Sequence, residues 1–239
     1  MRAAVGVMAR APSSGGKTRL APHLTASRLT ALSAALLSDT LQTVEHVPDV
    51  TIFFTPDDME ADIASVCAGA ISRVPQGDGD LGARMLRALQ FLLQVSDTVA
   101  GQPQQPGCLT PWGQTPRGLT PDAVVLIGSD IPLLSVDHLR EAEETLQARG
   151  GIVLGPADDG GYYLIGMTRV HAGLFEGIAW GTDSVLTDTL RAAERCGVEA
   201  RLVRSMYDVD TIDDLRRLER DLALMPADRC PALRRWFPL

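Results

Sequence analysis

Short apolar runs alternate with stretches of helical periodicity along most of this chain. Runs rich in small and β-branched apolar residues predict strands at 3–8, 50–55, 71–74 and 124–127. Between these runs, apolar residues recur at helical spacing over 25–44, 57–67 and 81–95. This alternation of strand and helix is typical of an α/β fold with a mainly parallel sheet.

The same alternation continues in the second half of the chain. Here we predict helices at 135–148, 183–196 and 211–224, and strands at 151–154, 162–167 and 199–203. Short polar side chains at the helix starts are expected to accept hydrogen bonds from the first turn. The predicted N-caps are Thr25 or Ser27 for 25–44, Ser135 for 135–148, and Asp210 or Thr211 for 211–224.

One stretch breaks the alternation. Residues 96–122 are rich in Pro, Gly and Gln, and a connection of this length without periodicity is unusual inside a compact domain. Because the α/β pattern resumes after it, we interpret it as a surface insertion, either a plain solvated loop or a lid over the substrate. We therefore predict one domain over 1–225 and a tail over 226–239, with Trp236 and Phe237 packed back on the body.

Composition narrows the class of protein. The 239 residues are 45% hydrophobic and 22% charged, which is typical of a globular protein. A formal net charge of −8 argues against a general binder of nucleic acid or of anionic membranes. The sequence has no apolar run of about 18 residues and no signal-peptide pattern, so we expect a cytoplasmic protein. Its four cysteines and four histidines lack metal-ligand spacing, and we expect reduced thiols.

The most informative segment follows the predicted strand 124–127, where the chain reads Gly128-Ser129-Asp130-Ile131-Pro132. In open α/β sheets, ligands bind just outside the carboxyl ends of the strands. Asp130 is therefore well placed to hold a divalent metal and, through it, a phosphate. Many α/β proteins carry such an aspartate, so the prediction depends on further segments.

A second segment, 11–18, has the sequence APSSGGKT. Its glycines let backbone amides approach a phosphate, and Lys17 supplies a positive charge for it. The spacing also fits a relaxed P-loop in which Ala11 replaces the first glycine. Pro22 argues against the P-loop, because a P-loop helix continues past its lysine and an interior proline costs about 3 kcal/mol.

Two more segments place carboxylates beside turns. Residues 155–166 contain paired aspartates and paired glycines before an apolar strand, which fits an ordinary turn or a place where backbone approaches a ligand. Residues 207–215 contain several aspartates at the start of the last predicted helix. Capping and the helix dipole explain some of them, but leave Asp208 without a structural role.

Together these segments resemble the glycosyltransferase-A (GT-A) type of nucleotide-diphospho-sugar transferase. They are most similar to a bacterial family of uncharacterised transferases often described as radical-SAM/selenodomain-associated transferases. A weaker likeness extends to 2-phospho-lactate guanylyltransferase and the molybdenum-cofactor nucleotidyltransferases. The resemblance implies a single α/β domain with a mostly parallel mixed sheet flanked by helices. It is carried by residues 9–12, 16–22, 75–77, 80–85, 127–132, 155–166, 180–182 and 207–215.

The resemblance also implies roles for individual residues, and it names Lys17 and Asp130 as catalytic. Asp130 and Asp210 would hold Mg²⁺ or Mn²⁺, and the chain lacks the second aspartate of a strict D-x-D motif beside Asp130. A second departure is Gly181, where we expect serine. The implied nucleotide-binding residues are Ala9, Arg10, Gly16, Lys17, Arg19, Gly77, Asp80 and Arg84. The implied acceptor-binding residues are Asp159, Gly160, Gly161 and Tyr162.

The function implied by the resemblance is metal-dependent transfer from a nucleoside triphosphate or nucleotide-sugar donor to a small acceptor. Glycosyl transfer and nucleotidyl transfer both stay open, and the missing second aspartate favours nucleotidyl transfer slightly. One alternative is a non-catalytic nucleotide-binding module of the same fold. A less favoured alternative is a P-loop-type NTPase. The sequence does not identify the base, the acceptor or the oligomeric state.

Overall fold

The computed structural model describes residues 2–67, 71–97 and 121–237. In these residues the chain forms one seven-stranded sheet with the strand order β3-β2-β1-β4-β6-β5-β7. Strand β6 runs antiparallel to β4 and β5, and the other neighbours pair in parallel. The strands are β1 (Ala3–Arg10), β2 (Val50–Thr55), β3 (Ser72–Pro75), β4 (Ala123–Gly128), β5 (Ile152–Pro156), β6 (Tyr162–Met167) and β7 (Ala200–Leu202).

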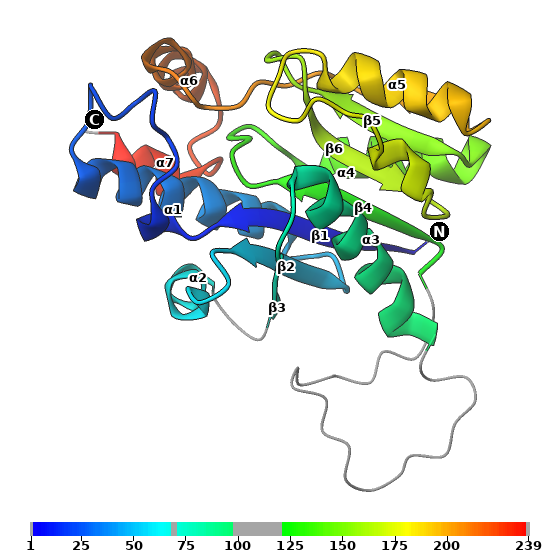
Figure 1. Ribbon diagram of the computed structural model, residues 1–239. Coiled ribbons are helices and arrows are strands. Elements are labelled where there is room, and N and C mark those ends of the chain that lie inside the picture. Colours follow the sequence, from blue (N-terminus) through cyan, green and yellow to red (C-terminus); the bar gives the residue numbers. More distant parts are fainter. Residues whose placement is uncertain (1, 68–70, 98–120, 238–239) are drawn as a thin grey trace, which may run out of the picture.

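Helices cover both faces of this sheet (Figure 1). They are α1 (Ala26–Val44), α2 (Glu60–Val66), α3 (Leu81–Asp97), α4 (Val136–Arg149), α5 (Val185–Arg195), α6 (Ile212–Leu224) and α7 (Pro231–Trp236), with 3-10 helices η1 (Pro12–Ser14) and η2 (Ala172–Phe175). The fold is therefore α/β with a mostly parallel mixed sheet flanked by helices, as predicted.

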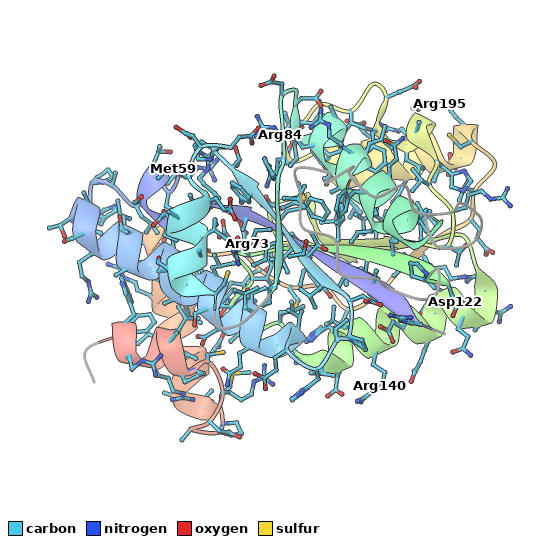
Figure 2. All side chains as sticks on the ribbon, turned by 90° about the horizontal axis from the view of Figure 1, so that it is seen from below. Met59, Arg73, Arg84, Asp122, Arg140 and Arg195 are labelled. Atoms are coloured by element: carbon cyan, nitrogen blue, oxygen red, sulfur yellow. The ribbon has the colours of Figure 1, made fainter. Side chains whose placement is uncertain are left out.

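Successive residues of a strand point to opposite faces, and this separates two hydrophobic cores. Val125 and Ile127 of β4 join the core formed with α1, α2 and α4. Val124 and Leu126 join the core formed with α3, α5 and η2. In Figure 2, Arg84 on α3 and Arg140 on α4 accordingly lie on opposite sides of the sheet. Burial on both faces explains why β4 has an uninterrupted apolar sequence.

A third core lies outside the sheet, on the far side of α1. Leu32 and Leu36 of α1 pack there against Leu215 and Leu218 of α6 and against Leu233 of α7. The buried carboxylate of Asp39 accepts hydrogen bonds of 2.9 Å from the amides of Ala232 and Leu233 at the start of α7. Each large apolar side chain buried in this way contributes about 1.5–3 kcal/mol to the free energy of folding. This core attaches the C-terminal helices to the body.

Most predicted elements are confirmed, with small changes at their ends. Thr25, Ser135 and Thr211 are the N-caps of α1, α4 and α6. The helix predicted from residue 57 begins at Glu60, because residues 56–59 form a turn closed by the Met59 amide and the Pro56 carbonyl.

The predicted C-terminal tail contains a helix that sequence periodicity missed, because α7 has only six residues. Its Trp236 packs back on the body as expected, and the Trp236 indole donates a 3.0 Å hydrogen bond to the Arg28 carbonyl. The insertion predicted at 96–122 lies outside the described residues between 98 and 120.

None of the helices in the described ranges is long and apolar enough to cross a membrane. The cysteines that the structure describes, Cys67, Cys196 and Cys230, are free thiols, which agrees with the prediction for these three.

Candidate functional site

A cleft of about 590 Å³ opens at the carboxyl ends of β1, β2 and β4. This is the edge of an open α/β sheet at which ligands are expected. Of the residues predicted to form the site, nine line this cleft. They are Ala9, Arg10, Arg19, Arg84, Asp130, Asp159, Gly161, Tyr162 and Asp210.

Asp130 stands two residues beyond the end of β4, and the backbone around it is fixed from two directions. The Thr40 hydroxyl of α1 donates a 3.3 Å hydrogen bond to the Ser129 carbonyl. The Val209 amide donates a 3.3 Å hydrogen bond to the Asp130 carbonyl. The carboxylate of Asp130 itself is 49% exposed, so the fold holds its backbone and leaves the side chain available.

Asp210 reaches the same place from the other end of the chain. The carboxylate of Asp214 accepts hydrogen bonds from the amides of Asp210 (3.1 Å) and Thr211 (2.7 Å), and the Thr211 hydroxyl caps the helix in return. The side chains of Asp214 and Thr211 thus provide the hydrogen bonds that cap the start of α6, and the side chain of Asp210 is not needed for capping. The Asp210 carboxylate, 42% exposed, is left for the cleft.

Lys17 joins these two aspartates. Its ammonium lies 3.1 Å from Asp130 Oδ2 and 3.3 Å from Asp210 Oδ1, and it donates a 2.6 Å hydrogen bond to the Val209 carbonyl. The lysine side chain is only 6% exposed and lies behind the carboxylates, outside the residues that line the open cleft. Burial lowers the pKa of Lys17, but the two carboxylates outweigh burial and raise it above its usual value.

The loop that carries Lys17 has the backbone its glycines predict. Gly15 and Gly16 adopt positive φ angles of 78° and 137°, and the side chain of Arg10 packs directly over Gly16. Residues 18–24 then form turns, anchored by the fully buried Leu20, and α1 begins only at Ala26. The P-loop alternative is therefore wrong, because no helix continues from the lysine.

Three arginines give the cleft a basic side. Arg10 is the last residue of β1, Arg19 lies in the loop that follows, and Arg84 stands on the first turn of α3. Within the described residues no carboxylate forms an ion pair with any of them. Arg84 Nε donates a 2.9 Å hydrogen bond to the Gly79 carbonyl. This side of the cleft offers positive charge to an anion.

Two residues predicted to bind the nucleotide have structural roles instead of a place in the cleft lining. The Asp80 carboxylate accepts a 2.8 Å hydrogen bond from the Ala83 amide in the first turn of α3. Gly77 has a φ of 72°, and its amide donates to the Asp57 carboxylate over 3.2 Å. Both residues shape the loop between β3 and α3.

The acidic side of the cleft lies toward β4 and β6, whereas the arginines belong to β1, to the loop after it and to the helix that follows β3. The turn between β5 and β6 contributes to this acidic side. The carboxylate of Asp159 accepts a 2.9 Å hydrogen bond from the Gly161 amide, which holds it at the cleft. Gly160 has a φ of 89°, and a Cβ atom there would lie 2.2 Å from the Asp183 carbonyl oxygen. Gly160 is thus required by the fold and does not line the cleft.

Tyr162 lines the cleft with its ring and not with its hydroxyl. The hydroxyl is buried beside the hydroxyl of Thr189. Burial raises the pKa of Tyr162 above its ordinary value. The residue therefore presents an apolar ring surface to whatever enters the cleft.

Several residues that line the cleft had no predicted role in the site, and Asp208, Trp180 and Gln76 are the most informative of them. Asp208 lines the cleft, and burial followed by the charges of Asp210 and Asp159 raises its pKa to about 6. The sequence does contain one indication of this, because helix capping explains other aspartates of segment 207–215 but not Asp208. Trp180 also lines the cleft and packs on Gly82 of α3. Gln76 is buried, and its amide donates to the carbonyls of Ala9 (3.2 Å) and Phe53 (2.9 Å), which ties β3 to β1 and β2.

The donor atoms suit a hard divalent ion shared with a ligand. Lys17 contacts one oxygen each of Asp130 and Asp210. The second oxygen of Asp130, Oδ1, accepts only a long 3.5 Å hydrogen bond from the neighbouring Ser129 hydroxyl, and both carboxylates are partly exposed. Among the described residues no three His, Cys, Asp or Glu side chains are grouped to hold a metal. Mg²⁺ is commonly bound by one or two carboxylates, with waters and substrate phosphates completing the octahedron. The carboxylates of Asp130 and Asp210 therefore fit such an ion only if waters and the phosphates of a bound ligand supply the remaining ligands.

A family model described as "Uncharacterized protein conserved in bacteria (DUF2064)" matches residues 37–182. This is more than half of the chain. The protein belongs to this family. The match includes Asp130 and the turn at 159–162, and Lys17 and Asp210 lie outside it. No curated protein matches the sequence.

Solved structures place this DUF2064 member in the predicted superfamily. A protein of Desulfovibrio desulfuricans G20 named "putative nucleotide-diphospho-sugar transferase" is similar with 26% identity and a TM-score of 0.80, over 98% of this chain and 95% of that one. The predicted likeness to this superfamily is confirmed.

Two nucleotidyltransferases share the fold at lower identity. A 4-diphosphocytidyl-2C-methyl-D-erythritol synthase of Anaerococcus prevotii has 13% identity and a TM-score of 0.54, over 92% of this chain and 98% of that one. A cytidylyltransferase of Leptospira borgpetersenii has 13% identity and a TM-score of 0.55, over 95% and 88% of the two chains.

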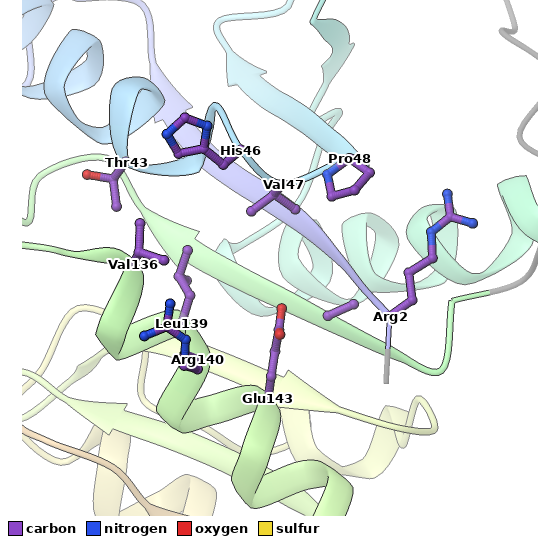
Figure 3. Close-up of a pocket in the computed structure, with 10 residues that line it drawn as sticks. Arg2, Thr43, His46, Val47, Pro48, Val136, Leu139, Arg140 and Glu143 are labelled. Carbon is purple, nitrogen blue, oxygen red and sulfur yellow. The ribbon is translucent and has the colours of Figure 1, made fainter.

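A smaller hollow of about 350 Å³ lies at the opposite edge of the sheet, where β1 and β4 begin. Figure 3 shows Arg2, His46, Arg140 and Glu143 around it. Arg2 pairs with Asp49, and Arg140 pairs with an aspartate of its own helix. The arginines that line this hollow already have ion-pair partners. In addition, ligands of open α/β sheets usually bind at the carboxyl ends of the strands and not at their amino ends. The cleft is thus the better candidate site in this DUF2064 protein.

Proposed function

We propose that this protein is a transferase that binds a nucleotide donor, either a nucleoside triphosphate or a nucleotide-sugar, together with a divalent metal and a small acceptor. The observation that carries the proposal is the division of the cleft. Arginines that have no ion-pair partner among the described residues line one side, and the carboxylates of Asp130 and Asp210 lie on the other. A phosphate chain with a bound metal matches both sides at once.

Arg10, Arg19 and Arg84 would bind the phosphates of the donor. Guanidinium groups form paired hydrogen bonds with phosphate oxygens, and these charge-assisted bonds are about twice as strong as neutral ones. The positive charge also offsets the negative charge that develops during group transfer. The positive φ angles of Gly15 and Gly16 shape the loop between Arg10 and Arg19.

Asp130 and Asp210 would hold the metal, Mg²⁺ or Mn²⁺, through the carboxylate oxygens that Lys17 does not contact. When bound, the metal would neutralise phosphate charge and orient the donor. The hydrogen-bonded backbone at Ser129 and Asp130 would position the Asp130 carboxylate for the metal. The capping box of α6 would position the Asp210 carboxylate in the same way. This arrangement requires no covalent intermediate.

The acceptor would lie beside the turn at 159–162. Asp159 and Asp208 offer hydrogen-bond acceptors there, and the rings of Tyr162 and Trp180 offer apolar surface.

A thermal-shift panel tests the proposal. The protein is heated with each nucleoside triphosphate and with common nucleotide-sugars, with and without Mg²⁺. A ligand at 100 times its dissociation constant stabilises the fold by about 2.7 kcal/mol. For a chain of this size that raises the melting temperature by roughly 5–10 °C.

The pattern of shifts separates the alternatives. A magnesium-dependent shift with one triphosphate indicates nucleotidyl transfer and identifies the base, and a shift confined to one nucleotide-sugar indicates glycosyl transfer. Binding without turnover of the donor favours the non-catalytic module. The absence of any shift contradicts the proposal.

A further inference from the structure

The ammonium of Lys17 occupies the inner side of the proposed metal site. It contacts Asp130, Asp210 and the Val209 carbonyl at 2.6 to 3.3 Å, which satisfies its three N–H donors. Its side chain is 6% exposed, whereas the two carboxylates are 49% and 42% exposed. The cation is thus built into the protein behind the pair.

This arrangement changes the charge that an incoming metal meets. Two carboxylates alone would present a charge of −2 to the cleft, and Lys17 reduces it to −1. A divalent ion at the outer oxygens would also lie close to the ammonium, which repels it. With only two protein ligands and a neighbouring cation, the site is poorly suited to bind a free metal ion.

We propose that Lys17 is an internal counter-cation that keeps the affinity of the Asp130–Asp210 pair for free divalent metal low, so that the metal binds together with the phosphates of the donor. The inference rests on the proposed function, since it concerns the same site. The donor supplies the missing ligands and the negative charge that offsets Lys17. Lys17 is in this role a positioning residue, since it acts through the two carboxylates.

Calorimetric titration with Mn²⁺ alone, in the absence of nucleotide, tests the role of Lys17. The comparison uses the unmodified protein, Lys17→Met, which removes the charge but keeps most of the apolar stem, and Lys17→Arg, which keeps the charge. We expect Lys17→Met to bind free Mn²⁺ at least ~10-fold more tightly, because Coulomb repulsion is removed. We expect Lys17→Arg to stay within about threefold of the unmodified protein. A purely structural role for Lys17 predicts the opposite, a weaker metal site in Lys17→Met.

Equal or weaker Mn²⁺ binding in Lys17→Met overturns the inference. Lys17→Gln repeats the test with a side chain that still donates to the Val209 carbonyl, in case the methionine variant does not fold. The double variant Lys17→Met, Asp130→Asn must lose the gained affinity if the gain belongs to this site.

The inference and the proposed function fail in different ways. If nucleotide and metal together stabilise the unmodified protein but Lys17→Met binds Mn²⁺ no better, only the role of Lys17 is wrong. If no donor shifts the melting temperature and none of the Lys17 variants binds Mn²⁺, the metal-dependent transferase itself is contradicted.

Discussion

The two sides of the cleft differ in how their charges are held. On the basic side, Arg10 and Arg19 have no ion-pair partner in the part of the chain that the structure describes. Arg10 ends β1, and Arg19 lies in the loop after it. On the acidic side, Asp130 and Asp210 are joined by Lys17, and Asp159 is held by the Gly161 amide. The acidic side is already neutralised in part and fixed, whereas the basic side offers charge to an incoming ligand.

This difference suggests which side responds to a ligand. A partly exposed arginine loses side-chain entropy when it binds a phosphate, so its contribution appears only in the complex. A carboxylate that is held by contacts within the fold is already ordered before the ligand binds, so its side chain loses little further entropy in the complex. Substitutions on the acidic side should therefore change both stability and binding, and substitutions on the basic side should change binding alone.

Gly160→Ala should have the largest effect and act on stability. The new Cβ would clash with the Asp183 carbonyl at a φ of 89°, and we expect a loss of about 3 kcal/mol in the free energy of unfolding. Urea denaturation measures it. Gly181→Ala is the matched control, because Gly181 has a φ of 81° with open space around it, and its cost should be about 1–2 kcal/mol. Equal losses at both positions would show that the acidic turn is not tightly held.

Asp130→Asn should come next and act on metal-dependent binding. The amide keeps the shape of the side chain but loses the charge, so we expect donor affinity in Mg²⁺ to fall by about 100-fold, equivalent to about 2.7 kcal/mol. Calorimetry with and without Mg²⁺ checks this, and circular dichroism checks that the fold is kept. Unchanged magnesium-dependent affinity would remove Asp130 from the metal site.

Arg19→Ala should have the smallest effect and act only on phosphate binding. We expect the affinity for the nucleotide donor to fall by about tenfold, with the affinity for the matching nucleoside unchanged. Arg216→Ala serves as control, because Arg216 pairs with Asp213 on the exposed face of α6, away from the cleft. A similar loss for nucleotide and nucleoside would contradict a phosphate role for Arg19.

Much of the fold could be predicted from the sequence, because the signals are local. The apolar run of β4 with Asp130 at its end, the short polar caps such as Ser135, and the proline that prevents a helix after Lys17 act within a few residues. The six-residue helix α7 was missed because its periodicity is too short to recognise, and tertiary contacts with α1 stabilise it.

The site could be predicted only in part, because its decisive contacts are long-range. No local pattern indicates that Lys17 bonds to the Val209 carbonyl, 192 residues away, and the lysine was therefore predicted to bind phosphates directly. Tyr162 was assigned to the acceptor as a whole residue. Both faces of β6 are buried, so its sequence could not show that the Tyr162 hydroxyl is buried away from the cleft. Which face a buried strand residue takes depends on packing that a local pattern does not contain.

The contact between Lys17 and Val209 has a consequence for biosynthesis. Chains are made from the amino terminus, and sequence-distant contacts form after local ones. On a ribosome, the loop that carries Lys17 emerges long before Val209 and Asp210, so the lysine lacks two of its three partners while most of the sheet is already synthesised. The acidic side of the cleft is therefore completed late, and a nascent chain that stops before residue 209 cannot form it.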